Sequence, residues 1–276
     1  MTKRRAQTIV VLVGTTGVAA LATALLPRIP QPQWYHHFAD TRKFLNIPNA
    51  ANVLSNVGFL VVGVPAMVLL LRRQPHARFV TPDEKWPYLA FFTSIALTAI
   101  GSSYYHLAPD NDRLFSDRLP IAFAAGAIVA AAFSDRLGPK AGNRLLLPLL
   151  GLGAASTLHW IYSEHLGKGD LRFYGFMQSY PVLIIPALVL ATHDRYTRTT
   201  DLAIAGGLYG LAKVCEFLDK PIFLLGKVIS GHTLKHLFAA AAAYVIARML
   251  MKREIVTDTE KRPLAQSASS SKPFTR

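Results

Sequence analysis

Apolar residues in this chain come in long blocks separated by short polar stretches. Each block runs for roughly 17–20 residues, the length that an α-helix needs to cross the hydrocarbon core of a bilayer. The fourth and seventh blocks are rich in Ala or Gly, whose small side chains let helices approach closely in lipid, so we expect both to pack centrally. Eight blocks are apparent, over residues 8–27, 52–71, 87–106, 118–134, 145–162, 173–192, 201–218 and 232–250.

This pattern predicts an all-α integral membrane protein, a seven-transmembrane-helix bundle with an extra N-terminal transmembrane helix. We expect residues 1–30 to form an N-terminal transmembrane anchor and residues 31–251 to form the seven-helix domain. A signal peptide is the alternative for the first block, since "ALA" at 20–22 resembles a cleavage site. The polar, Ser-rich end of the chain, residues 252–276, is predicted to be a disordered cytoplasmic tail.

The composition favours a membrane protein over a soluble one. Hydrophobic residues make up 51% of the chain and charged residues only 17%, fewer than in soluble domains. A net charge of +14 is typical of basic loops that set membrane topology, and no nucleic acid is expected because no basic stripe with aromatic residues lies outside the apolar blocks. No obligate protein partner is evident. The single cysteine, Cys215, excludes an internal disulfide and a cysteine-based zinc cluster.

Lysine and arginine residues are more numerous in the loops on the side of the N-terminus. Basic loops stay in the cytoplasm, so we predict a bacterial inner-membrane protein with both termini cytoplasmic. The third block then ends, and the fourth and eighth begin, at the extracytoplasmic face. This topology places His106, Asp117 and the pair His232 and His236 at one depth near that face.

The segment "GHTLKH", residues 231–236, places His232 and His236 four residues apart. On a helix this spacing puts both imidazoles on one face, where they can bind one metal ion. Two solvated histidines at a membrane interface are the alternative, because this spacing alone is a weak signal. His106 reaches the same depth from another block, and three histidines with a water form an open, catalytic zinc geometry.

Two further polar residues accompany the histidines. Asp117 can orient a metal-bound water and carry its proton, or it can be the N-cap of the fourth helix. Ser102, one turn before His106, can donate to a developing oxyanion or bond to its own helix. Asp110 and Asp112 are expected to be solvated loop residues.

Other ionisable residues lie inside the apolar blocks, where they are costly. Lys213 and Glu216 are predicted to form an internal ion pair, with contact to a substrate headgroup as the alternative. His159 is an interfacial residue or a partner of the metal ligands, and Trp160 is expected in the interfacial aromatic belt. Lys235 is predicted to face away from the paired histidines.

The serine, histidine and aspartate of residues 102–117, followed by H-x3-H at 232–236, resemble the alkaline ceramidase family. This family belongs to the CREST superfamily of seven-transmembrane zinc hydrolases, and the chain resembles a bacterial-type member. "DRLP" at 117–120 is similar to the family's D-x-L-P, and "NVLSN" at 52–56 is similar to its N-T-x-S-N. The likeness spans roughly residues 45–250.

The resemblance implies a zinc ion held by His106, His232 and His236. It implies that a zinc-bound water attacks an amide carbonyl, with Asp117 assisting and Ser102 near the oxyanion. The protein would then be a hydrolase acting on linear amide C–N bonds. Its substrate would be a membrane lipid, ceramide or a related N-acyl lipid, and its products a fatty acid and an amine such as a sphingoid base.

One departure from the family concerns calcium. The family binds calcium through an acidic cluster around the first core helix. Here the segment from Arg28 to Ala51 contains a single acidic residue, Asp40. Asn49 stands where the family has a glutamate. A calcium site is therefore doubtful, and the specificity for ceramide is open with it.

Two other functions remain as alternatives. One is a non-catalytic seven-helix receptor or lipid-binding membrane protein with a structural zinc. The other is a transporter whose histidines relay protons, which is disfavoured because the polar groups gather at one face and do not line a path across the membrane. Asp117 and Ser102 favour the hydrolase, since a structural zinc site needs neither.

Overall fold

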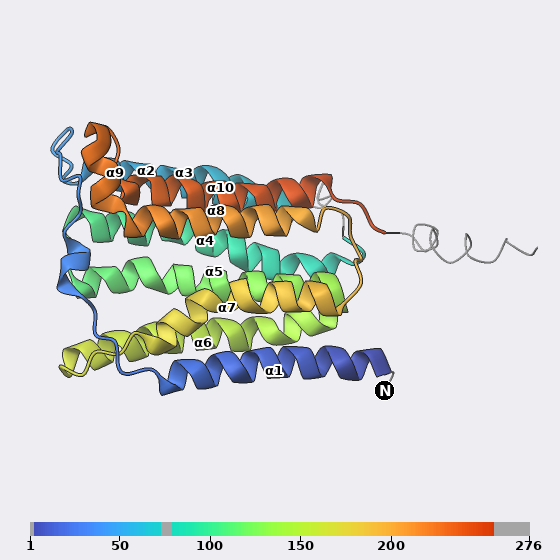
Figure 1. Cartoon of the computed structure of the whole chain (residues 1–276). Helices are drawn as coiled ribbons and strands as arrows, with labels where there is room; N and C mark the ends of the chain where they lie inside the picture. The colour runs from blue at the N-terminus through green and yellow to red at the C-terminus, as the bar shows by residue number, and fades with distance from the viewer. Residues whose placement is uncertain (1–2, 73–78, 257–276) are drawn as a thin grey trace, which may run out of the picture.

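The computed structural model describes residues 3–72 and 79–256, and this part of the chain contains helices and two isolated bridges but no strand. The long helices lie side by side along one bundle axis (Figure 1). They are α1 (Lys3–Leu25), α2 (Ala50–Ser55), α3 (Val57–Leu71), α4 (Lys85–Leu107), α5 (Asn111–Leu137), α6 (Pro139–His165), α7 (Arg172–Ala191), α8 (Thr200–Phe217), α9 (Asp219–Gly226) and α10 (Gly231–Lys252), with 3-10 turns η1 (Gln33–His36) and η2 (Pro82–Glu84).

Among the described residues, six helical segments are long and apolar enough to cross a membrane, as predicted for a membrane protein. They are α1 from Ala6, α2 and α3 together, α5, α6, α7 and α10. The blocks at 87–106 and 201–218 are also helices, α4 and α8, but they fall below this apolarity. Serine, threonine and tyrosine interrupt α4, and α8 carries Asp201, Lys213 and Glu216.

The Ala-rich helix α5 lies at the centre of the packing, as predicted, with Ala122, Ala127 and Ala130 fully buried. It packs closely against both α4 and α6. The same prediction is wrong for α8, which packs mainly on α10 and buries only four of its residues, Asp201, Ala205, Ala212 and Cys215. Small residues are needed for close packing but do not by themselves decide which helix is central.

The two ends of the bundle differ. At one end, the segment that contains η1 runs past the end of α4 and the starts of α5 and α10, and α9 lies there too (Figure 1). At the other end, the start of α1 and the end of α10 lie on the same side of the bundle. Histidines near the end of α4 and the start of α10 therefore belong to the end covered by η1.

The chain continues in a fixed structure beyond α10. Arg253 is fully buried, forms a 2.6 Å ion pair with Asp135, and lies 3.9 Å from the ring centroid of Tyr196. A bridge joins Tyr196 to Ile255. The disordered tail predicted over 252–276 therefore begins too early, because residues 253–256 pack on the bundle. Residues 257–276 lie outside the described part of the chain.

Candidate metal centre

Two glycines bring the helices of the site together. A Cβ atom at Gly101 of α4 would lie 2.0 Å from the backbone oxygen of Ser116 in α5. A Cβ atom at Gly231, the first residue of α10, would lie 2.1 Å from the backbone oxygen of Cys215 in α8. Glycine is required at both positions, because any side chain would force the backbones apart.

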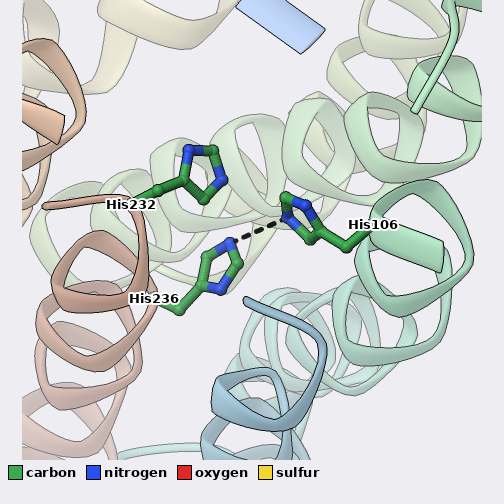
Figure 2. A group of neighbouring side chains, drawn as sticks. All are labelled: His106, His232 and His236. Atoms are coloured by element: carbon green, nitrogen blue, oxygen red, sulfur yellow. Dashed lines mark hydrogen bonds between the residues drawn. The ribbon is translucent and has the colours of Figure 1, made fainter. Parts of the chain in front are cut away.

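The structure brings His106, His232 and His236 together, with exposures of 0%, 3% and 2%. One ring nitrogen from each lies within 4.8 Å of the others. Figure 2 shows the rings turned toward one another, His106 from α4 and the other two from α10. The Nε2 atoms of His106 and His236 are 3.3 Å apart.

This arrangement fits a zinc ion. Two imidazole nitrogens at about 2.05 Å from one tetrahedral zinc lie about 3.3 Å from each other, which matches the spacing of the two Nε2 atoms. Nε2 of His232 is buried without a hydrogen-bond partner among the described residues. Such a group costs about 1–3 kcal/mol, and a shared metal ion would remove that cost.

A hydrogen bond sets the tautomer of His236. The Ser55 hydroxyl donates to the backbone oxygen of Asn52 at 3.0 Å, and its oxygen lies 2.7 Å from Nδ1 of His236. Because the hydroxyl proton is already used, Nδ1–H is the donor in this contact. Nε2 of His236 then keeps a free lone pair on the side of the other histidines, which is the form that binds a metal.

The segment before α2 covers the histidines. The ring of Phe38 is 4.6 Å from the rings of His106 and His232, centroid to centroid. Phe38 itself is only 7% exposed. The end of the bundle next to the cluster is therefore closed by an aromatic side chain rather than open to solvent.

Hydrogen bonds fasten this covering segment. The Asp219 carboxylate accepts from the backbone N–H of Ala39 at 2.9 Å and from that of His232 at 2.7 Å. Asn49 donates to the backbone oxygen of His106 at 2.8 Å. The backbones of two candidate ligands are thus tied to the segment that carries Phe38.

Ser102 and Asp117 lie together beside the cluster. Ser102 is 1% exposed and Asp117 is 4% exposed, and the Ser102 hydroxyl lies next to the Asp117 carboxylate. Ser102 is one helical turn before His106 in α4. The contact between α4 and α5 thus places the candidate acid–base residue next to a serine that is one turn from a candidate metal ligand.

Asp117 is not an N-cap, so that alternative is wrong. Helix α5 begins at Asn111, and Asp110 caps it by accepting from the backbone N–H of Arg113 at 2.7 Å. Asp110 is a half-exposed loop residue, as predicted, with the added role of a cap. Asp112 is solvated as predicted but lies in the first turn of the helix, where it contacts His165 at 2.8 Å. Asp117 lies in the second turn of α5, with its carboxylate available to the site.

A cluster of charges adjoins the same region. Lys213 and Glu216 form the predicted ion pair at 2.7 Å, and Lys235 adds a second ammonium to the same carboxylate at 2.8 Å. Tyr35 donates to Glu216 at 2.7 Å. The prediction for Lys235 needs correction, because its long side chain reaches across to α8 and its charge acts on all three histidines.

Sequence reasoning missed Arg118. Its guanidinium lies 4.1 Å from the ring centroid of Trp160 and 4.8 Å from that of Tyr174, and it donates to Gln31 at 2.7 Å. Trp160 was predicted for the interfacial belt, but it is fully buried against Arg118. An arginine directly after Asp117, at the start of an apolar block, is the signal that could have found this residue.

Several other predictions concern residues near this end. His159 is exposed and its ring contacts the ring of Phe173. It is not part of the cluster of three histidines. Arg42 donates to both carboxylate oxygens of Asp40 and holds the pKa of Asp40 below its ordinary value. Burial lowers the pKa of His36, whose ring contacts Tyr105. The single acidic residue between Arg28 and Ala51 is thus already paired with an arginine.

No family model matches this chain, and no curated protein matches it. The resemblance to alkaline ceramidases therefore rests on the motifs and on their placement.

Proposed function

We propose that the protein is a zinc-dependent intramembrane hydrolase of lipid amides. Its seven-helix domain lies in a bacterial inner membrane behind the extra helix α1, with both termini cytoplasmic and the site toward the extracytoplasmic face. One observation carries the proposal: three buried histidines each offer a ring nitrogen within 4.8 Å of the others, and two of these nitrogens are 3.3 Å apart. Ser102 is one helical turn before His106, and the buried carboxylate of Asp117 lies next to Ser102.

His106, His232 and His236 would hold the zinc ion, whose role is to polarise the amide carbonyl and lower the pKa of a water to about 7. Asp117 accepts a proton from the attacking water and passes it to the amide nitrogen as the C–N bond breaks. The Ser102 hydroxyl orients this carboxylate and can turn to donate to the carbonyl oxygen as negative charge develops there. The products are a carboxylic acid and an amine.

A lipid amide suits this position in the fold. The histidines lie near the end of the helix bundle. An N-acyl lipid places its chains along the membrane-spanning helices and its amide near the interface. Ceramide is the substrate that the motifs favour, and related N-acyl lipids share the same reacting group.

Metal analysis of purified protein tests the site. The wild type should carry about one zinc per chain, as expected for one three-histidine site, and His232→Ala should lose most of it. His159→Ala is the matched control, because this exposed histidine lies outside the cluster. Equal zinc content in wild type and His232→Ala would refute the proposed metal centre.

Hydrolysis of a lipid extract tests the activity. Asp117→Ala should keep its zinc and release no fatty acid, whereas Asp112→Ala, which changes an exposed residue of the same helix, should behave as wild type. Full activity in Asp117→Ala would remove the role given to this residue. A zinc-loaded wild type that cleaves no lipid amide would favour the alternative, a non-catalytic receptor with a structural zinc.

A further inference from the structure

Arg118 is a buried cation that forms no ion pair within the described part of the chain. The residue is 7% exposed, and its Nη2 donates to the neutral amide oxygen of Gln31 at 2.7 Å. Its Nη1 is buried and has no hydrogen-bond partner among the described residues, and no carboxylate in that part of the chain forms an ion pair with it. A charged group in such a place is costly and is commonly functional.

Aromatic rings hold the guanidinium in place. The ring centroids of Trp160, Tyr174 and Tyr35 lie 4.1, 4.8 and 5.7 Å from its central carbon. Cation–π contacts offset part of the cost of burial, but they do not use the N–H groups at the edge of the guanidinium. The side chain is therefore fixed with a free donor edge, the form in which arginine recognises carboxylates and phosphates.

The neighbouring carboxylates are engaged by other groups. Lys213 and Lys235 share the carboxylate of Glu216, and Tyr35 links Glu216 to the face of Arg118. Glu164 accepts from the backbone N–H of Gln31 and from the indole of Trp160, and Asp117 has the proposed role of a proton carrier. None of these carboxylates forms an ion pair with Arg118 in the described part of the chain.

We propose that Arg118 binds an acidic group on the amine half of the substrate, so that the enzyme prefers anionic lipid amides over neutral ceramides. The acid is a carboxylate or a phosphate attached close to the amide nitrogen. The amine half is the part that Arg118 meets, because Arg118 lies at the polar end of α5 against Gln31 of the covering segment. This inference rests on the proposed lipid amidase.

Paired substrates with one acyl chain test the inference. N-acylglycine and its neutral amide, N-acylglycinamide, differ only in the carboxylate, and phosphorylated and free N-acylethanolamine form the corresponding phosphate pair. Wild type should cleave the acidic member of at least one pair about tenfold faster or more, the worth of a charge-assisted hydrogen bond. The pair that shows the preference tells carboxylate from phosphate.

Arg118→Gln should bring that ratio close to one, and Arg144→Gln, which removes an exposed arginine on α6, should leave it as in wild type. Equal rates within both pairs in the wild type, or an unchanged ratio in Arg118→Gln, would overturn the inference.

Binding of the same four lipids separates this inference from the proposed function. Trp160 packs on Arg118, so a ligand at the guanidinium should change tryptophan emission, and affinities follow from titrations of wild type and Arg118→Gln. If no lipid is cleaved but the acidic member binds tighter to wild type alone, the anion site stands and the amidase fails. If the two members of each pair bind equally, the anion site fails whatever the activity.

Discussion

Replacing Gly101 by alanine tests whether the contact between α4 and α5 sets the geometry of the site. The added Cβ would lie 2.0 Å from the backbone oxygen of Ser116 and 2.7 Å from its carbonyl carbon. Cβ contacts below 3.0 Å essentially do not occur, and both atoms belong to backbone that cannot rotate away. The two helices must therefore separate by about 1 Å, which moves Ser102 and His106 relative to Asp117.

The size of the effect follows from this displacement. Overpacking of this kind costs about 1–3 kcal/mol, so the thermal midpoint in detergent should fall by several degrees. Activity should fall further, because a misplacement of about 1 Å in a catalytic site can cost about a hundredfold in rate. Thermal unfolding and initial rates of lipid amide hydrolysis, measured on the same preparations, check both numbers.

Gly151→Ala is the matched control. Gly151 is an exposed residue inside α6, and a Cβ there meets no atom within 4 Å. The substitution should leave activity unchanged and leave stability equal or up to about 1 kcal/mol higher, because alanine favours helix more than glycine does. If Gly101→Ala has the same thermal midpoint and the same initial rate as Gly151→Ala, the contact between α4 and α5 does not position the site, and the reasoning is refuted.

Two further predictions concern metal affinity and topology. Ser55→Ala should weaken zinc binding by about tenfold or more in competition with a chelator, because the partner that fixes the ligand tautomer is lost. The control is Ser179→Ala, which removes a hydroxyl bonded only within its own helix and should bind zinc as wild type does. Equal affinities of Ser55→Ala and wild type would refute the tautomer assigned to His236. A reporter fused to the C-terminus should give a cytoplasmic signal, and a periplasmic signal would invert the predicted topology.

The helices were predictable because hydrophobicity is a local property. Every apolar block is helical in the structure, although the block at 52–71 is divided into α2 and α3. The helix boundaries were less predictable. Hydropathy indicates which residues cross the hydrocarbon core, and a helix can continue beyond that core. Helix α5 starts at Asn111, seven residues before the predicted block at 118–134, because the polar segment "NDRLFSD" is helical too. Because the helix starts earlier, Asp117 lies inside it and cannot be its N-cap.

The sequence predicted which end of the bundle carries the site, but not which helices meet there. The topology placed His106, His232 and His236 at the same end, where the ends of all the other helices lie as well. The contacts of Gly101 with Ser116 and of Gly231 with Cys215 decide which ends touch, and such backbone approaches leave no periodic signal in a sequence.

Buried pairings are also hidden from the sequence. A tryptophan near a block end is typical of the interfacial belt, and only the position of Arg118 on another helix makes Trp160 a buried partner. Long side chains add to this difficulty, since Lys235 reaches Glu216 of α8 although helix geometry alone sets its Cβ about 100° away from that of His236.

The covering segment adds a constraint on how a substrate reaches the histidines. Asp219 binds the backbone next to Phe38 and the backbone of His232 with the same carboxylate. Lifting Phe38 from the cluster would break one of these hydrogen bonds and release the backbone that orients a candidate ligand. Opening the bundle at this end therefore competes with metal binding.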